Sequence, residues 1–530
     1  MEITRIIMEK VKRHKIEILC LSAILLLASF FYFYNITQKG FFDHDEAWFS
    51  LTGNTYAAAP KILINHILHP QISIEDLISE YLPGHVLFGT SVRPLFIFVN
   101  ALGISIFGYH DYSIFILNSV IGLLTLLVLY YLAKSITKSN IQALLATFFF
   151  AISGYQIFFA RSGLGQVLIG LLLILGAIFY IKTLNATADS GQENRKNLLW
   201  AGFFWGLMSI SHYSIIAILI LIFIFEIAFN IFYLKQKISF AAKRLLYLFL
   251  PIVLILLSMQ AIFLLRNYVL AKIGYPGRPF LYFEEFFYYF NPFGGTGYSF
   301  KIADLAFYVK LLHDLNGWLY TLLFLASPII FFYKKWYKNP SLFFVFFIAW
   351  GFFSGFSIVA FKGTRNLAII SVLISFIAAL VLYELFKLFQ SRYYKFLMAG
   401  LFIGLLTIQL RIDWQIINLK SGYKEAARYI TENNIPTEDV YGENWPILAF
   451  YLDRKVQIFD RNPRVVYYAF DWLVKSEKEK KFYYDLQRRG KVIASFDNPP
   501  ANTSAVLGEN EFIFPKEDFN KIKIYKVIQW

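Results

Sequence analysis

Three carboxylates stand within four positions near the start of the chain, at Asp43, Asp45 and Glu46, just after its first long apolar segment. Acids crowded among aromatic residues at a low-dielectric boundary are costly to ionise together. Such clusters persist where one carboxylate acts as a general base or where the group binds a cation. The Asp-x-Asp spacing of Asp43 and Asp45 also permits ligation of Mg²⁺ or Mn²⁺, and a solvated acidic loop is the plain alternative.

A second candidate set is basic and lies on the side of the membrane where loops are normally poor in Lys and Arg. Its members are Arg93, Arg161, Arg266, Lys272, Arg278, Lys362 and Arg365. About half of them need do no more than snorkel to the interface, but Arg161, Lys362 and Arg365 lie in very short turns. Arg and Lys recognise phosphate, and a phosphate at this surface is most simply the head of a lipid.

Acids and phosphate-binding cations on one membrane face suit a transferase that takes a sugar from a lipid phosphate. The cations would stabilise the phosphate leaving group, and a carboxylate would deprotonate the attacking hydroxyl. Such a donor needs no nucleotide-binding fold. The Gly-rich stretch 291–299 follows no strand, so a nucleotide phosphate loop is not indicated there, and we interpret it as an outer loop.

The elements that must position these residues are membrane spans. The chain of 530 residues is 58% hydrophobic and only 16% charged, with a mean hydropathy of +0.53, whereas soluble proteins are about 45–50% apolar and 25% charged. The fold class is therefore a polytopic α-helical membrane protein with about eleven spans. We expect the spans at 17–36, 112–133, 141–159, 164–182, 198–212, 213–233, 245–265, 316–333, 341–361, 366–386 and 396–411.

The loops between these spans test their number. With the N-terminus inside, every inside loop is basic, beginning with Lys134 and Lys138 and ending with Lys387, Arg392 and Lys395. This bias accounts for most of the net charge of +15 by cytoplasmic retention of Lys and Arg, so no nucleic-acid partner is needed. The expected location is the plasma (inner) membrane, with a cytoplasmic N-terminus and an extracytoplasmic C-terminus.

Three larger pieces fall outside: 37–111, 267–316 and the tail. We expect 93–107 to be an interfacial or re-entrant helix, because it is short for a span. Residues 1–411 form the membrane domain and 412–530 a small soluble α/β domain. In the tail we expect a helix over 422–434 and strands at 439–441, 456–459, 492–496 and 522–528.

Weaker candidates for substrate binding complete the set. They are Asp43, Gln166, Arg266, Arg278, Glu284 and Glu285. No metal site is evident beyond the possible pair Asp43 and Asp45, because the histidines of 37–111 lack helical metal-ligand spacing. The sequence thus permits a divalent cofactor, Mg²⁺ or Mn²⁺, but does not require one.

The order of several short motifs resembles the C-superfamily (GT-C) membrane glycosyltransferases, in the branch of protein O-mannosyltransferases and bacterial aminoarabinose transferases. The motifs are Asp45-Glu46-Ala47 opening the first outer loop, Arg93-Pro94-Leu95, Phe107-Gly108, the FFARSGLGQ turn of 158–166 and the Lys362-Gly-Thr-Arg365 turn. The resemblance extends over the membrane spans. In the tail it is limited to the expected presence of a small exterior α/β domain.

The resemblance implies that Asp45 is catalytic, with Glu46 beside it, and that Arg93 contacts the lipid phosphate. It also implies that Lys362 and Arg365 lie near that phosphate. Family members often have a second acid after the third span, where this sequence offers only Gln166.

The expected function is transfer of a sugar from a polyprenyl phosphate to a hydroxyl on a lipid, glycan or protein, with inversion of configuration at the sugar. We expect Asp45 as base, Glu46 as supporting carboxylate, and Arg93, Arg161, Lys362 and Arg365 as phosphate ligands. One alternative is a flippase of lipid-linked sugars, which would place charged sites near the membrane midplane. Another is a non-catalytic assembly or sensor subunit.

Overall fold

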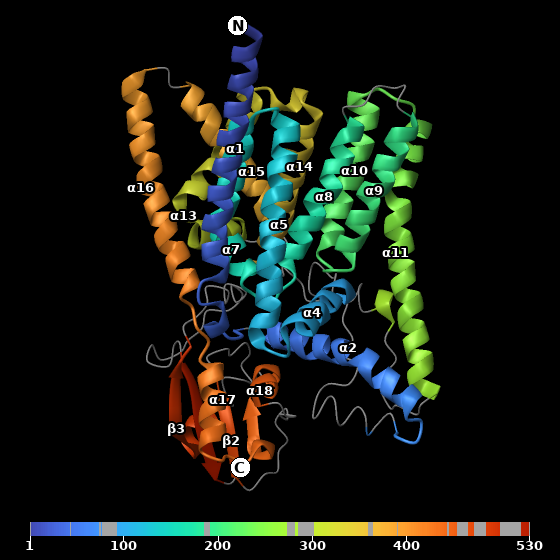
Figure 1. The fold of residues 1–530 in the computed structure, drawn as a ribbon, viewed down its shortest axis with the longest axis vertical. Coiled ribbons are helices and arrows are strands. Elements are labelled where there is room, and N and C mark those ends of the chain that lie inside the picture. Colours follow the sequence, from blue (N-terminus) through green and yellow to red (C-terminus); the bar gives the residue numbers. More distant parts are fainter. Residues whose placement is uncertain are drawn as a thin grey trace.

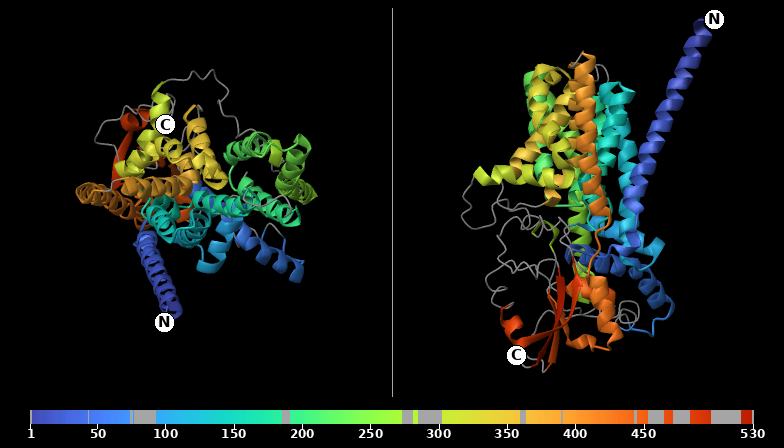
Figure 2. Two further views of the ribbon diagram at one scale, coloured as in Figure 1. Left: turned by 90° about the horizontal axis from the view of Figure 1, so that it is seen from above. Right: turned by 90° about the vertical axis from the view of Figure 1, so that its left-hand side faces the viewer.

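A computed structural model describes most of the chain. It covers residues 2–42, 44–73, 76, 93–184, 191–272, 281–284, 302–358, 364–388, 391–442, 445–452, 465–470, 484–498 and 521–528. Long helices run side by side in a bundle, with the N-terminus at one end and the C-terminal strands beyond the other (Figures 1 and 2).

The bundle consists of the helices that correspond to the expected membrane spans. They are α1 (Glu2–Phe33), α5 (Asp111–Thr137), α6 (Asn140–Ala151) with α7 (Gly154–Ala160), α8 (Gln166–Leu184), α9 (Gly191–Ser209), α10 (Ile215–Ala228) continued by η2 (Phe229–Tyr233), α11 (Ile238–Lys272), α13 (Ile302–Tyr333), α14 (Pro340–Ile358), α15 (Thr364–Leu388) and α16 (Arg392–Ile417). Each of the eleven expected spans coincides with one of these helices or, for 141–159, with the bent pair α6 and α7.

Among the described residues, nine helices are long and apolar enough to cross a membrane, or ten if α6 and α7, bent by 59°, form one span. The remaining expected span is α9, whose first half is polar and which the same test does not include. Only 17% of the apolar window of α11 and 11% of that of α16 is buried inside the protein. Apolar helices exposed in this way face lipid, so the expected polytopic helical membrane fold is confirmed.

Helix α9 packs tightly against its neighbours although it is the least apolar of the set. A side chain at Gly176 of α8 would clash with the indole of Trp205, and one at Gly202 of α9 would clash with the backbone oxygen of Leu248. The Trp205 indole N–H donates to the carbonyl of Leu173 at 3.2 Å. Small residues that let helices approach this closely are typical of membrane bundles, which supports a place for α9 among the spans.

Two helices lie across the end of the bundle that faces the C-terminal strands (Figure 1). They are α2 (His44–Leu68) and α4 (Pro94–Phe107), which pack closely enough that a side chain at Gly53 would meet Asn100. Pro94 occupies the first turn of α4, where its missing N–H costs no hydrogen bond. The expected short helix over 93–107 is therefore present and does not span the bundle.

Helix α13 is kinked, which explains where the expected span at 316–333 begins. Gly317 has φ 65° and ψ −178° inside the helix, a conformation that a side chain would disfavour. The preceding Asn316 accepts hydrogen bonds from Ser153 at 3.0 Å and from the backbone N–H of Tyr155 at 3.1 Å. The part of α13 before the kink belongs to the segment 267–316 that the sequence places outside.

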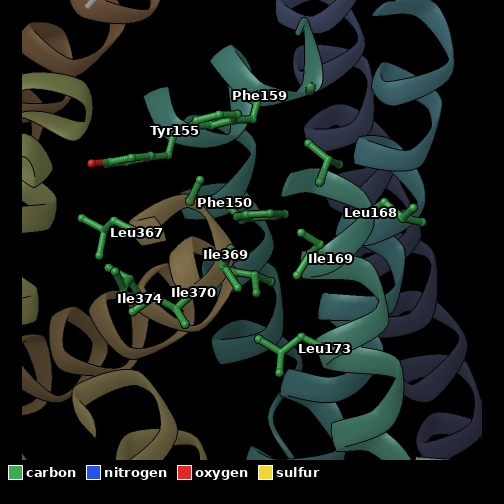
Figure 3. Close-up of a cluster of buried hydrophobic side chains, with 14 of the residues drawn as sticks. Phe150, Tyr155, Phe159, Leu168, Ile169, Leu173, Leu367, Ile369, Ile370 and Ile374 are labelled. Carbon is green, nitrogen blue, oxygen red and sulfur yellow. The ribbon is translucent and has the colours of Figure 1, made fainter. Parts of the chain in front are cut away.

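The apolar core near the site joins the end of α6, α7, α8 and the start of α15. Phe150, Tyr155 and Phe159 pack with Ile169 of α8 and Leu367 of α15 (Figure 3). Within a membrane such side chains hold helices together by van der Waals packing, because lipid tails are as apolar as they are. This core fixes the first turn of α15, which carries Arg365, against the turn that follows α7.

The C-terminal part combines helices and a small sheet. Helices α17 (Tyr423–Glu432) and α18 (Trp445–Leu452) accompany strands β1 (Val440–Gly442), β2 (Val465–Phe470), β3 (Gly490–Asp497) and β4 (Lys521–Ile528). The strand order is β1-β2-β4-β3, with β1 parallel to β2 and the other pairs antiparallel. The helix expected over 422–434 and three of the four expected strands are present, the strand expected at 456–459 lies outside the described residues, and β2 and α18 were not expected.

Polar contacts tie this part to the end of the bundle. Lys424 contacts the Asp111 carboxylate at 3.1 Å, and the Tyr451 hydroxyl donates to the same carboxylate at 2.7 Å. The Ser421 N–H donates to the carbonyl of Lys39 at 2.7 Å. The boundary between a membrane domain and a soluble domain near residue 412 stays a prediction, since α16 continues to Ile417.

Candidate active site

An ion-pair cluster lies where α2, α4 and α15 begin. Asp45 is in the first turn of α2 and its carboxylate pairs with the guanidinium of Arg365, in the first turn of α15. The same carboxylate oxygen lies 3.7 Å from Nη1 of Arg93, which precedes α4. The Asp45 side chain is 32% exposed. One acid and two expected phosphate ligands therefore meet at a site that solvent can reach.

Charge determines the protonation of Asp45. Burial by itself would raise the pKa of its carboxyl, but the opposite charges of Arg365 and Arg93, with a smaller contribution from His44, lower that pKa below its usual value. Asp45 is therefore ionised at neutral pH.

The position of Arg93 is set by backbone and aromatic contacts. Its guanidinium carbon lies 4.9 Å from the centre of the Phe49 ring and 5.6 Å from that of Tyr213. Aromatic faces attract cations at such distances. The backbone N–H of Leu95 donates to the carbonyl of Ile210 at 3.3 Å, so the start of α4 is attached to the turn between α9 and α10.

Glu46 lies apart from this cluster despite being next to Asp45 in sequence. It is 1% exposed, and its carboxylate accepts from the backbone N–H groups of Phe42 and Gly163, each at 2.9 Å, and from Lys39 at 3.4 Å. A side chain at Gly163 would contact Glu46 at 3.0 Å. These contacts fasten the start of α2 to the turn after α7, so the geometry gives Glu46 a positioning role.

The expectation that Arg161 binds phosphate needs correction. Its side chain is 1% exposed and donates to the carbonyls of Phe31, Tyr32, Tyr34 and Ile417 at 2.7–3.2 Å. These carbonyls belong to the C-terminal ends of α1 and α16, where the helix dipole favours a cation. Arg161 thus joins two helices and does not reach the Asp45 cluster.

Gln166, the expected substitute for a second acid, is also buried. It begins α8 and is 1% exposed. It lines a small cavity of about 10 Å³ with Gln156 and Ser371, which is room for about one water. The structure therefore places Gln166 inside the bundle.

The weaker candidates do not join the cluster, or lie outside the described residues. Arg266 of α11 donates to Asn267 at 3.1 Å, and its charge acts on Tyr56, which is eleven residues along α2 from Asp45, or about 16 Å. Glu284 is exposed. The candidates that lie outside the described residues are Asp43, Arg278, Glu285 and Lys362.

The described residues contain no group of three His, Cys, Asp or Glu side chains that could hold a metal. The pair of Asp43 and Asp45, whose spacing permits a divalent metal, includes a residue outside that part of the chain.

An aromatic group from α2 and the C-terminal part lies beside Asp45. The ring centres of Trp48 and Trp445 are 5.8 Å apart, and His44 lies 6.4 Å from Trp48 and 6.3 Å from Trp445. All three side chains are partly exposed. The sequence analysis did not anticipate Trp445, because its approach to α2 depends on docking of α18.

His212 was missed as well. It lies in the turn between α9 and α10 and is 2% exposed. Burial lowers the pKa of its imidazole well below the usual value, and the charges of Arg93 and Arg365 lower it further, while Asp45 acts in the opposite sense. A polar run, Ser209 to Ser214, between two apolar segments was the available signal.

Comparison with known proteins agrees with this arrangement. Residues 91–263, less than half of the chain, match the family described as dolichyl-phosphate-mannose-protein mannosyltransferase. A search of curated proteins finds no match.

Solved structures show the same fold. ArnT from Cupriavidus metallidurans in the apo state is 12% identical with a TM-score of 0.56, and the match covers 96% of this chain and 97% of that one. ArnT bound to undecaprenyl phosphate has the same score and coverage at 10% identity. The apo oligosaccharyltransferase of Archaeoglobus fulgidus is 11% identical with a TM-score of 0.56, over 83% of this chain and 64% of that longer one. The chain therefore has the GT-C fold, which the motif order predicted.

Proposed function

We propose that this protein is a GT-C membrane glycosyltransferase that transfers a sugar from a polyprenyl phosphate to a hydroxyl acceptor. The observation that carries the proposal is the contact of Asp45 with both Arg365 and Arg93 at one end of the bundle. A base and two phosphate-binding cations, delivered by three separate helices, are the groups that this reaction requires.

The comparisons support the same chemistry. The matched family is described by a lipid-phosphate sugar donor. ArnT has been solved with undecaprenyl phosphate and the archaeal oligosaccharyltransferase with dolichol-phosphate. Both relatives thus hold a polyprenyl phosphate within the fold that this chain shares.

In the proposed reaction the donor phosphate lies against Arg93 and Arg365 while its polyprenyl tail stays in the bilayer. Asp45 accepts the proton of the acceptor hydroxyl as that oxygen bonds to the anomeric carbon. The bond from the anomeric carbon to the phosphate oxygen breaks, and its electron pair leaves on the phosphate, where the guanidinium groups stabilise the charge. One displacement inverts the configuration of the sugar.

Donor binding also prepares the base. In the free protein the two arginines lower the pKa of Asp45, which makes it a weak proton acceptor. A phosphate placed between them offsets their charge, so the pKa of Asp45 rises and its carboxylate is released toward the acceptor. The donor is therefore expected to bind before the acceptor.

The proposed site opens on the extracytoplasmic side of a plasma membrane. In Figure 1 the loops between α5 and α6 and between α13 and α14 lie at the end of the bundle that holds the N-terminus, and α2, α4 and the C-terminal strands lie at the other. Those loops carry Lys134, Lys138, Lys334 and Lys335. Since basic loops stay in the cytoplasm, the end with Asp45 faces away from it.

A flippase is less well supported. Two of the acids within the spans, Glu226 and Glu384, each have a cation partner: Arg244 lies 2.5 Å from Glu226 and Lys334 lies 3.0 Å from Glu384. Both pairs lie toward the end of the bundle opposite to Asp45 and leave these carboxylates neutralised. These two acids therefore offer no charged site that could carry a lipid headgroup through the midplane of the membrane.

The test is transfer of radiolabelled sugar from a polyprenyl phosphate by purified protein in lipid nanodiscs. The variant Asp45→Asn should lower the rate of transfer by about 10²–10⁴-fold with little change in donor binding. Full transfer by Asp45→Asn would refute this residue as the base.

A further inference from the structure

One buried imidazole, His212, is placed between the elements that carry the phosphate-binding cations. The turn that holds it is attached to the start of α4 by the hydrogen bond from Leu95 to Ile210 at 3.3 Å. It is attached to the start of α15 by the Ser214 hydroxyl, which donates to the Asn366 side chain at 3.2 Å. Between them, Tyr213 lies 5.6 Å from the Arg93 guanidinium. His212 is therefore built into the frame that positions Arg93 and Arg365.

Hydrogen bonding fixes the tautomer of His212. The backbone N–H of Ser214 donates to Nδ1 at 3.2 Å, so Nδ1 carries no proton and the ring is neutral. The single ring proton must then be on Nε2. The lowered pKa of this imidazole, caused by burial and by the nearby guanidinium groups, agrees with this neutral state.

The Nε2–H group has no hydrogen-bond partner in the described part of the chain. Leaving such a donor buried costs about 1–3 kcal/mol, and buried donors of this kind call for an explanation. Arg93 and Arg365, whose charges act on this imidazole, add further donors, and a group of donors of this kind favours an anion.

We propose that the Nε2–H of His212 donates a hydrogen bond to a phosphate oxygen of the lipid-linked donor. This inference rests on the proposed function. It adds an uncharged phosphate ligand to Arg93 and Arg365, and this ligand comes from the turn between α9 and α10. A neutral donor holds the phosphate without adding a positive charge beside Asp45. It also donates to the leaving group as negative charge develops there, which lowers the barrier.

The experiment measures binding of undecaprenyl phosphate to the full-length protein in nanodiscs, with a matched pair of variants. His212→Asn keeps an acceptor near Nδ1 for the Ser214 N–H but removes the distal donor. His212→Gln places an amide N–H near the position of Nε2. The control Ser211→Ala changes a buried hydroxyl in the same turn that bonds only to the carbonyl of Leu207 at 2.9 Å.

The dissociation constant should rise about tenfold in His212→Asn, the loss expected for a hydrogen bond to a charged group. In His212→Gln and Ser211→Ala it should stay within about threefold of wild type. The thermal stability of His212→Asn is measured in parallel, because weaker binding at an unchanged Tm separates loss of this contact from loss of the fold. Undiminished binding by His212→Asn overturns the proposal.

Two further measurements distinguish failure of the role of His212 from failure of the proposed function. Inorganic phosphate is titrated in parallel: a loss in both titrations puts the contact on phosphate itself, and a loss for the lipid alone puts it on the lipid-linked group. If wild type does not bind undecaprenyl phosphate, the proposed function fails, whereas weak binding by Arg93→Ala with normal binding by His212→Asn rejects only the role of His212. If His212→Asn does not fold, His212→Ala is used, and recovery of binding with added imidazole is the supporting result and its absence the opposing one.

Discussion

Asp45 and Arg365 are 320 positions apart in the sequence, yet their side chains form an ion pair between the first turns of α2 and α15. Arg93 reaches the same oxygen from a third helix. The pair therefore reports whether the outer helices and the bundle are correctly assembled, and it links the charge of the base to occupancy of the phosphate site.

The pH dependence of transfer should change when Arg365 loses its charge. The folded-state pKa of Asp45 is depressed, so the stability due to this ionisation is present above the unfolded pKa near 4 and is lost as pH falls toward the folded value. In Arg365→Gln one cation is gone while burial remains, so the pKa of Asp45 rises. The acid limb of kcat/KM should therefore move to higher pH, whereas Arg365→Lys should resemble wild type; superimposed profiles for Arg365→Gln and wild type would contradict this.

Glu46→Gln should damage folding more than chemistry. The substitution leaves Lys39, which is 2% exposed, without its buried counter-charge, at a cost of about 3–5 kcal/mol. Thermal unfolding in detergent should show a clear fall in Tm. The double variant with Lys39→Met should recover much of that loss, and an unchanged Tm in Glu46→Gln alone would be inconsistent with a positioning role.

Arg161→Gln should lower stability without a selective loss of donor affinity. Four carbonyl contacts at about 1.5–3 kcal/mol for hydrogen bonds to a charged group make several kcal/mol available to lose. Arg93→Ala is the comparison: it should raise the dissociation constant for undecaprenyl phosphate about tenfold or more with a smaller change in Tm. If Arg161→Gln lost donor affinity and Arg93→Ala lost stability, Arg161 would be the phosphate ligand and Arg93 the structural residue.

Trp445→Ala should raise KM for the acceptor about fivefold and leave donor binding unchanged. The indole lies 5.8 Å from the ring of Trp48, in the helix α2 that carries Asp45, and aromatic faces contribute about 0.5–1.5 kcal/mol in such contacts. Trp200→Ala, which removes an exposed tryptophan of α9, is the matched control. A loss confined to donor affinity would place Trp445 on the other substrate.

Transfer should continue after treatment with EDTA. Arg93 and Arg365 already supply the positive charge that a lipid phosphate needs, and they occupy the Asp45 oxygen that a metal would use. The measurement compares initial rates before and after chelation, with Mg²⁺ or Mn²⁺ added back. Loss of activity that either cation restores would instead establish a metal at Asp43 and Asp45.

Sequence reasoning predicted the spans, because apolar length and basic loops are properties of composition along the chain. It also selected Asp45, Arg93 and Arg365, which the structure brings together. It could not separate Asp45 from Glu46: neighbouring helical residues point about 100° apart, and which one faces inward depends on how α2 is laid across the bundle.

Arg161 and His212 show what the sequence lacked. Arg161 has the sequence signature of an outer cation, but its partners are backbone carbonyls of residues more than 100 positions away, which no local pattern encodes. His212 stands in a short polar turn like many others. His212 becomes a candidate ligand only in the structure. There the Ser214 N–H fixes the imidazole proton on Nε2, which has no hydrogen-bond partner within the described residues.

The contacts of Arg161 have a consequence for biosynthesis. The residue follows the third span, yet its side chain binds carbonyls at the C-terminal ends of α1 and α16. During insertion, seven or more further spans must be synthesised before the carbonyl of Ile417 is present to accept a hydrogen bond from the Arg161 guanidinium. A nascent chain halted before α16 thus carries a buried cation with an acceptor still missing, and quality control can recognise such a chain as unfinished.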